Sequence, residues 1–386
     1  MRIGRIISLA LGLASLGVVH AADGPYPKGL PQTPESFPLA VWLQAPANAE
    51  RYKAIGINTY VAIYRGPTED QLDALDKAGI RLICGQNERS LRFRDRPTIV
   101  GWMHGDEPDN AQSLGQGKGY GPPIPPARIV EGYERIRKAD PDRPVLLNLG
   151  QGVAWDGWYG RGVRTNHPED YPEYLKGCDI ASFDIYPVVH ESPEVSGKLW
   201  WVARGVERLV NWSGERVVWN CLECTHISNL DRKPTPHQVR CEAWMSLVRG
   251  SRGLIFFVHQ FQPVFREAAL LDDTEMLAAV TALNRQITEL APVLNSPSIQ
   301  DAAQVKSANP EVPIAFALKR HRDSTYVFAV AMRDGSTSAT FTLAGLTGDT
   351  PVTVLGEQRE LWAKQGAFTD TFAPWDVHLY QLRQHE

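Results

Sequence analysis

Cysteine is scarce in this sequence, and its spacing completes neither framework that cysteines usually build. An odd number of cysteines argues against a full set of disulfide bonds. One Cys-x-x-Cys pair is present, Cys221 with Cys224, but no second pair completes a four-ligand zinc site. We therefore expect no metal centre and no cofactor, and the pairing of the thiols stays open. The five cysteines are at positions 84, 178, 221, 224 and 241.

An excess of positive charge is also missing. The 40 Lys and Arg residues are outnumbered by 44 Asp and Glu residues, which gives a formal net charge of -4 at pH 7. The composition therefore offers no basic surface for nucleic acid. Tryptophan, by contrast, is plentiful, with 11 residues. Exposed aromatic faces suit flat ligands such as sugar rings, and buried ones suit a core; the sequence leaves both open.

Long apolar runs are confined to the N-terminus. Arg2 and Arg5 precede an apolar stretch over residues 6–19, too short to span a bilayer comfortably, and Val19-His20-Ala21 is a small-residue cleavage pattern. We predict that residues 1–21 are a signal peptide and that the protein is exported to the periplasm or the medium. No later segment is apolar enough for a membrane span, and no cysteine follows the cleavage site to carry a lipid.

Residues 22–300 repeat one unit, consisting of a short apolar run, a loop and an amphipathic helix. Capping boxes at 68–71 and 235–238 open two of the helices, and residues 127–139 and 272–291 are typical of two others. Alternating strands and helices require a parallel sheet. The eight apolar runs are 37–44, 57–64, 80–86, 98–104, 144–149, 179–186, 216–224 and 253–260.

Eight such units favour a closed (β/α)₈ barrel, or TIM barrel, within the α/β class. An open doubly wound sheet is the alternative. No glycine-rich phosphate fingerprint follows the first apolar run, and that absence favours the barrel.

Beyond Pro292 the helical spacing gives way to β-alternation. The strand candidates are separated by Asp-Gly and Gly-Asp turns. We predict a small C-terminal antiparallel β-sandwich domain over residues 305–386. Its expected strands are 314–319, 326–332, 338–343, 351–355 and 377–382.

In a (β/α)₈ barrel, functional residues lie at the C-terminal ends of the strands. Two acids stand out there: Glu107 in GWMHGDEPDN after the fourth run, and Glu223 in VVWNCLE at the seventh. Two carboxylates on opposite walls of a sugar-sized cleft are what glycoside hydrolysis requires. The candidate substrate-binding residues at the same ends are Trp42, Asp106, Asn148, Trp155, Tyr186, His259 and Gln260.

The period-two alternation of strands predicts which of these side chains face the barrel axis. Asp184 and Tyr186 share the polar face of the sixth strand, and Glu223 reaches the mouth if its face of the seventh strand points inward. On the fourth strand Asp106 continues one face. Glu107 therefore needs a bulge or must project from the following loop.

In these motifs and their order, the chain resembles the large clan of retaining glycoside hydrolases with barrel glutamates after strands four and seven. CDIASFDIYP resembles the clan's sixth strand, and YVFAVAMRDG with FTDTFAPWDVHLYQL resembles the β-sandwich appended to many members. The resemblance implies that Glu107 is the general acid/base, that Glu223 is the nucleophile and that Tyr186 donates to Glu223. It also implies an oligo- or polysaccharide substrate.

The chain departs from the clan at one position. The clan usually has an asparagine before the acid/base, where this chain has Asp106. An aspartate there is expected to raise the pKa of Glu107, and it accepts rather than donates hydrogen bonds at neutral pH. The departure leaves the sugar open.

Other functions remain to be weighed. A non-catalytic carbohydrate-binding barrel would lack one carboxylate or hold the pair out of register, and both are present. A metal-dependent hydrolase predicts a His-x-His after the first strand, where this chain has Trp42 and Gln44. In a purely structural role, Glu107 would be a helix N-terminal acid and Glu223 a buried ion-pair partner. The linkage, endo or exo action and oligomeric state are not encoded in these motifs.

Overall fold

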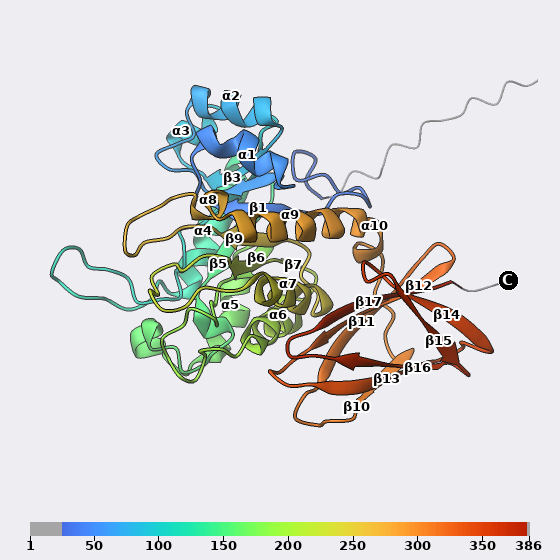
Figure 1. The fold of residues 1–386 in the computed structure, drawn as a ribbon. Helices are drawn as coiled ribbons and strands as arrows, with labels where there is room; N and C mark the ends of the chain where they lie inside the picture. The colour runs from blue at the N-terminus through green and yellow to red at the C-terminus, as the bar shows by residue number, and fades with distance from the viewer. Residues whose placement is uncertain (1–24, 384–386) are drawn as a thin grey trace, which may run out of the picture.

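The computed structural model of the chain describes residues 25–383. The expected signal peptide, residues 1–21, lies outside the described residues. A parallel barrel with surrounding helices is followed by an antiparallel β domain (Figure 1). This arrangement confirms the fold class predicted from the sequence.

The barrel sheet is parallel throughout and runs in the order β7-β6-β5-β4-β3-β2-β1-β9-β8. The seventh strand is split into β7 and β8 on either side of Trp219. A parallel bridge from Asp184 to Cys221 joins the two edges and closes the barrel, which excludes the open sheet. All eight apolar runs contain strands: β1 Leu39–Trp42, β2 Thr59–Val61, β3 Arg81–Gly85, β4 Ile99–Met103, β5 Val145–Leu149, β6 Ile180–Phe183, β7 Val217–Val218, β8 Asn220–Glu223 and β9 Leu254–Phe257.

The helices cover the outside of the barrel, and the predicted caps are present. The side chain of Thr68 caps α2 (Glu69–Ala78), which ends at Gly79 in the left-handed region with φ 66°, and Thr235 caps α7 (Pro236–Val248). The remaining helices are α1 Ala49–Ala54, α3 Glu88–Leu91, α4 Pro126–Ala139, α5 Tyr171–Leu175, α6 Trp200–Ser213, α8 Ala269–Asp272, α9 Thr274–Glu289 and α10 Ala291–Leu294.

The C-terminal domain is an eight-stranded antiparallel sheet in the order β10-β13-β16-β15-β14-β17-β12-β11, folded over its own apolar core. The sequence predicted five of its strands. It missed β10, β15 and β16, because these strands are rich in polar residues and show little alternation of apolar with polar side chains. The strands are β10 Ala303–Ser307, β11 Ile314–His321, β12 Ser324–Ala331, β13 Thr337–Leu343, β14 Asp349–Val354, β15 Arg359–Lys364, β16 Ala367–Phe372 and β17 Val377–Arg383.

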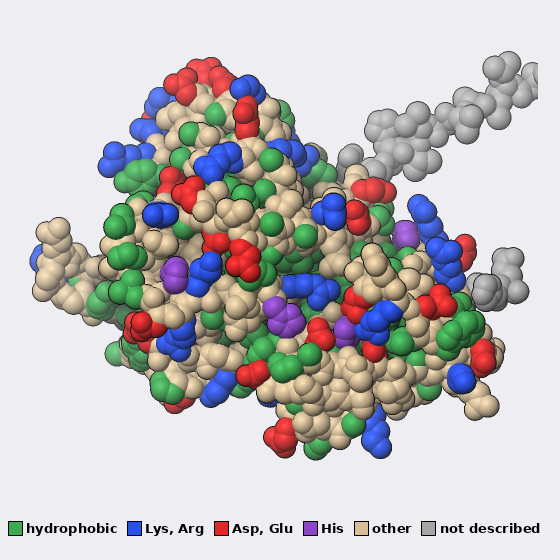
Figure 2. Space-filling view, viewed as in Figure 1, with side chains coloured by type: hydrophobic (Ala, Val, Ile, Leu, Met, Phe, Trp, Pro, Cys, Tyr) green, Lys and Arg blue, Asp and Glu red, His purple; other side chains and the backbone are tan. Residues whose placement is uncertain are grey.

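One face of this domain packs against α7 and extends the apolar core of the barrel (Figure 1). Trp244 of α7 lies with its ring centroid 5.1 Å from that of Phe328 in β12. Arg240 donates to the carbonyl of Val377 at 3.0 Å. On the face shown in Figure 2, acidic and basic side chains are interspersed, in keeping with the small net charge.

We predict that the two domains unfold as one unit. Phe328→Ala removes a fully buried ring from the shared core and should lower the free energy of unfolding by about 3–5 kcal/mol. Trp362→Ala in the same domain is the control, because this ring is 54% exposed and its loss should change stability by at most about 0.5 kcal/mol. Urea unfolding followed by tryptophan fluorescence measures both. Two separate transitions, with that of the barrel unmoved by Phe328→Ala, would contradict the prediction.

Candidate active site

Glu107 lies in the loop after β4. The sequence predicted a bulge or a loop position, because Glu107 does not share the face of the strand that Asp106 continues. Its backbone adopts a left-handed conformation, with φ 42°. Its N–H donates to the carbonyl of Asn148 at 3.2 Å, which ties this loop to the end of β5. A non-glycine residue in this region is strained, and such strain concentrates at functional sites.

The Glu107 carboxyl lies between the ends of β5 and β6. A Cβ built on Gly150 would lie 3.0 Å from Glu107 Oε1 and 2.8 Å from Asn110 Nδ2, so only glycine leaves room for both groups. On the other side the carboxyl faces that of Asp184. Glu107 is therefore placed by three neighbouring strand ends.

This environment favours the protonated form of the Glu107 carboxyl. Removal from water raises the pKa of Glu107 strongly, and the negative charges of Asp184, Asp106 and Asp109 raise it further. The contribution of Asp106 is the one expected from the sequence. A glutamate that stays protonated at neutral pH can serve as a general acid.

The two predicted polar residues beside Glu107 form one hydrogen-bonded chain. Ser182 in β6 donates its hydroxyl to Asn148 Oδ1 at 2.7 Å, which fixes the amide so that Nδ2 donates to Asp106 Oδ1 at 2.9 Å. Asp106 therefore has its own donor. The chain links β6, β5 and the loop after β4.

Asp109, which the sequence reasoning missed, anchors the same loop from below. It is fully buried and accepts hydrogen bonds from the N–H of Gly150 at 2.9 Å and the hydroxyl of Tyr171 at 3.0 Å. Its only signal in the sequence was a third acid in the stretch DEPD. These hydrogen bonds give Asp109 a structural role, so its presence requires no catalytic role.

Glu223 ends β8 but points into a closed environment. Its side chain has no exposed surface. Its Oε1 accepts from the N–H of Val188 at 2.6 Å, and its Oε2 from the N–H of Val189 at 3.1 Å. The carboxyl of Glu242 on α7 lies beside it. Burial raises the pKa of Glu223, while these donors oppose the rise.

Tyr186 does not donate to Glu223, contrary to what the resemblance implied. Its hydroxyl lies 3.4 Å from Cys221 Sγ, and Asp184 is its charged neighbour. The reason is the path of the chain after β6, which brings the main chain of Val188 and Val189 to Glu223 instead of the tyrosine ring. Tyr186 thus belongs to the Glu107 side of the mouth.

The ends of the first and last strands meet through the side chains of Gln44 and His259. His259 Nε2 is 3.3 Å from Gln44 Nε2, and its ring stacks on that of Phe261, which is exposed, with centroids 6.0 Å apart. Gln260 exchanges backbone hydrogen bonds with Arg266 and so shapes its loop. Trp42 is only 7% exposed and belongs to the apolar filling of the barrel.

The aromatic residues after β5 divide into core and surface. Trp155 is 7% exposed and joins the main core. The sequence left open whether the tryptophans bind sugar rings or fill the core, and Trp155 fills the core. Tyr159 is exposed, with its centroid 4.6 Å from that of Trp158. The indole N–H of Trp158 donates to Asn110 Oδ1 at 2.8 Å. This pair therefore stands beside Glu107.

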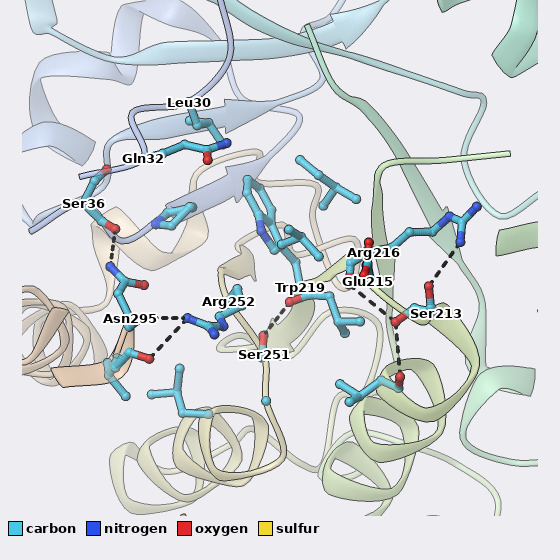
Figure 3. A pocket seen from close by; sticks show the side chains of 18 of the residues that line it. Leu30, Gln32, Ser36, Ser213, Glu215, Arg216, Trp219, Ser251, Arg252 and Asn295 are labelled. Atoms are coloured by element: carbon cyan, nitrogen blue, oxygen red, sulfur yellow. Dashed lines mark hydrogen bonds between the residues drawn. The ribbon is translucent and has the colours of Figure 1, made fainter. Parts of the chain in front are cut away.

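A large cavity lies at the opposite end of the barrel (Figure 3). Its volume is about 1160 Å³, and its walls come from residues 25–38, the residues before β6, β7 and β9, and strands β11 and β12. Arg252 and Trp219 border it, and Asn295 Nδ2 donates to the carbonyl of Ser36 at 2.9 Å across one edge. None of the candidate catalytic residues lines it.

All five cysteines are free and buried. Within residues 25–383, no three His, Cys, Asp or Glu side chains are grouped to hold a metal ion. No helix in that range has the length and apolar character needed to cross a bilayer.

Comparison with known proteins identifies solved structures that share the fold of this chain. An α-amylase from Geobacillus thermoleovorans complexed with acarbose matches with a TM-score of 0.58 and 10% identity, over 92% of this chain and 100% of that one. An Anoxybacillus α-amylase matches at 0.56 and 11%, over 92% and 100%. The maltogenic α-amylase AmyB from Thermotoga neapolitana matches at 0.52 and 10%, over 91% and 99%.

The chain therefore has the architecture of (β/α)₈-barrel glycoside hydrolases with a C-terminal β domain. Identity this low shows a shared fold and not shared catalytic residues. No protein-family model and no curated protein matches the sequence.

We predict that Asp184→Asn lowers the pKa of Glu107, because it removes the neighbouring negative charge that raises this pKa most. The sign also applies to stability. Folding raises the pKa of Glu107, so wild type loses stability as pH rises above the unfolded value of about 4.3, and the variant should lose less. Carbon-13 NMR of labelled glutamate carboxyls measures the titration. Asp323→Asn, an exposed change in the C-terminal domain, is the control; a Glu107 titration equal in all three proteins would contradict the prediction.

Proposed function

We propose that the chain is an exported glycoside hydrolase that cleaves O-glycosidic bonds of an oligo- or polysaccharide by a retaining double displacement. The observation that carries the proposal is Glu107 at the barrel mouth beside a second carboxyl, that of Asp184, in surroundings that raise the pKa of Glu107. Export is supported by the signal-peptide pattern of residues 1–21. The glycosidase fold supports the reaction class.

In this mechanism Glu107 gives its proton to the leaving oxygen as the glycosidic bond breaks. Glu223 attacks the anomeric carbon and forms a covalent glycosyl-enzyme. Glu107, now ionised, takes a proton from a water molecule whose oxygen attacks the anomeric carbon. The bond from that carbon to Glu223 breaks, Glu223 leaves as a carboxylate, and the sugar keeps its original anomeric configuration. Retention requires the two carboxyls to stand about 5–5.5 Å apart around the sugar.

The enclosure of Glu223 sets a condition on this mechanism. The N–H groups of Val188 and Val189 favour the ionised carboxylate that a nucleophile needs, but they also shield it. A sugar reaches Glu223 only if the segment after β6 moves away. Asp184, in direct contact with Glu107, is the competing second carboxylate.

We expect Glu107→Ala to harm natural glycosides far more than activated aryl glycosides. A good leaving group departs without a proton, whereas a sugar hydroxyl needs one, and general acid catalysis contributes about 10²–10⁴-fold. Steady-state kinetics on a nitrophenyl glycoside and the matching oligosaccharide, with azide added to capture the glycosyl-enzyme, measure the difference. Equal losses on both substrates, without azide rescue, would mean that Glu107 has no part in proton transfer.

We expect Glu223→Gln to abolish turnover on every substrate, with a loss of several orders of magnitude, roughly 10⁴-fold or more. Asp184→Asn should keep a measurable part of the activity, because Asp184 only supports Glu107. Proton NMR of the first-formed product should show the retained anomer. If Asp184→Asn is the inactive variant and Glu223→Gln keeps more than about a tenth of wild-type activity, Asp184 is the second catalytic carboxylate and Glu223 is structural.

The burial of Glu223 also favours one second candidate, a non-catalytic carbohydrate-binding barrel, since that role needs no reachable nucleophile. Calorimetric titration with oligosaccharides separates the two. Binding without turnover in wild type, unaffected by Glu223→Gln, would support the binding protein.

A further inference from the structure

Glu242 lies in the middle of α7 and is the most completely isolated carboxyl among the described residues. Its side chain has no exposed surface. Neither oxygen has a conventional donor within hydrogen-bond distance, and neither touches solvent. The charged group that most affects it is the neighbouring carboxyl of Glu223.

Two carboxylates cannot both be charged in such a place. An ionised carboxylate that is buried without a partner is strongly destabilising, and two like charges in contact add repulsion. Of the pair, Glu223 has the N–H groups of Val188 and Val189, and Glu242 has no such donor. The single proton therefore belongs on Glu242.

We propose that Glu242 is a positioning residue: it stays protonated in the folded protein, donates its carboxyl hydrogen to Glu223, and thereby holds Glu223 ionised and in a fixed orientation. This role for Glu223 rests on the proposed function. Together with the two main-chain donors, the hydrogen bond from Glu242 gives the Glu223 carboxylate three donors from three directions.

The surroundings support a proton held in place. The other titratable groups near the pair are Cys224, directly after β8, and Cys241, next to Glu242 on α7. Burial raises the pKa of both thiols, so they stay neutral. Arg232 in the loop before α7 lowers the pKa of Glu223 and so favours its ionised form. No cation offsets a charge on Glu242 itself.

The first test measures the proton without using activity. Glu242→Gln keeps the shape and a donor but cannot ionise. Folding raises the pKa of Glu242. Below about pH 4 this carboxyl is protonated in both the folded and the unfolded wild type, so it makes no pH-dependent contribution to stability. Above that pH the unfolded form loses the proton while the folded form keeps it, so the stability of wild type falls as pH rises, whereas that of the variant does not. The ratio of the two unfolding equilibrium constants in urea should grow about tenfold per pH unit above pH 5.

Glu275→Gln, the same change at an exposed site on α9, is the control and should follow wild type at every pH. Glu242→Met, which has a similar volume and no charge, replaces the amide variant if that variant fails to fold, and it should show a weaker pH dependence than wild type. Identical pH dependence in wild type and the Glu242 variants would overturn the proposal.

The second test measures the hydrogen bond to Glu223. In Glu242→Met that bond is lost, so the pKa of Glu223 rises and the acid limb of the kcat/KM profile should move up by about one pH unit. Glu242→Gln should restore the limb, which a merely structural role would not do. A limb that stays in place in the methionine variant would overturn the positioning role.

The outcomes separate this proposal from the proposed function. If Glu223→Gln remains active while the stability test succeeds, the proton on Glu242 is real but the nucleophile is misassigned, and the positioning role fails. If the stability test fails while Glu223→Gln is inactive, the proposed function stands and the proposal about Glu242 falls.

Discussion

The exclusion of water from carboxyl groups at the barrel mouth is the constraint on which the rest of the site depends. A carboxylate held away from water must accept hydrogen bonds or take up a proton. Asp109 and Glu223 follow the first course, with main-chain N–H groups and, for Asp109, the Tyr171 hydroxyl. Burial and neighbouring negative charge raise the pKa of Glu107 and of Glu242, which favours the second course for both. The site thus contains two pairs of neighbouring carboxyls, Glu107 with Asp184 and Glu223 with Glu242.

A single segment connects these two pairs. Asp184, directly after β6, contacts Glu107, and four and five residues later Val188 and Val189 hold Glu223. The bridge from Asp184 to Cys221 fixes the start of this segment at the point where the barrel closes. Whatever moves this segment must therefore change the environment of both candidate catalytic residues together. This coupling follows from the path of the chain.

Much of the fold could be predicted from the sequence, because periodicity and capping are local. The eight apolar runs, the capping boxes at Thr68 and Thr235, and the displacement of Glu107 from the face of β4 all followed from spacing. The candidate site was predictable only as far as strand ends could be counted.

What failed depended on side-chain direction in irregular backbone. The resemblance placed Tyr186 against Glu223, but the loop after β6 turns the ring towards Cys221 and offers its main chain in place of the hydroxyl. Glu242 gave no signal, because a single acid on a helix is ordinary until the helix is seen to be buried on all sides. The strands β15 and β16 were missed because polar residues occupy their exposed face and leave few apolar positions to count.

The two carboxyl pairs also determine which of the two candidate catalytic residues, Glu107 or Glu223, ionises at the lower pH. A retaining glycosidase needs its acid protonated and its nucleophile ionised at the same pH, which two glutamates in similar surroundings cannot provide. Here the surroundings differ in kind. Glu107 faces acceptors, since Asp184, Asp106 and Asp109 surround it with negative charge, whereas Glu223 faces donors. Burial and like charge raise the pKa of Glu107 to about 11, whereas hydrogen bonds limit the rise that burial causes at Glu223 to about 7, so the surroundings separate the two pKa values before any substrate binds.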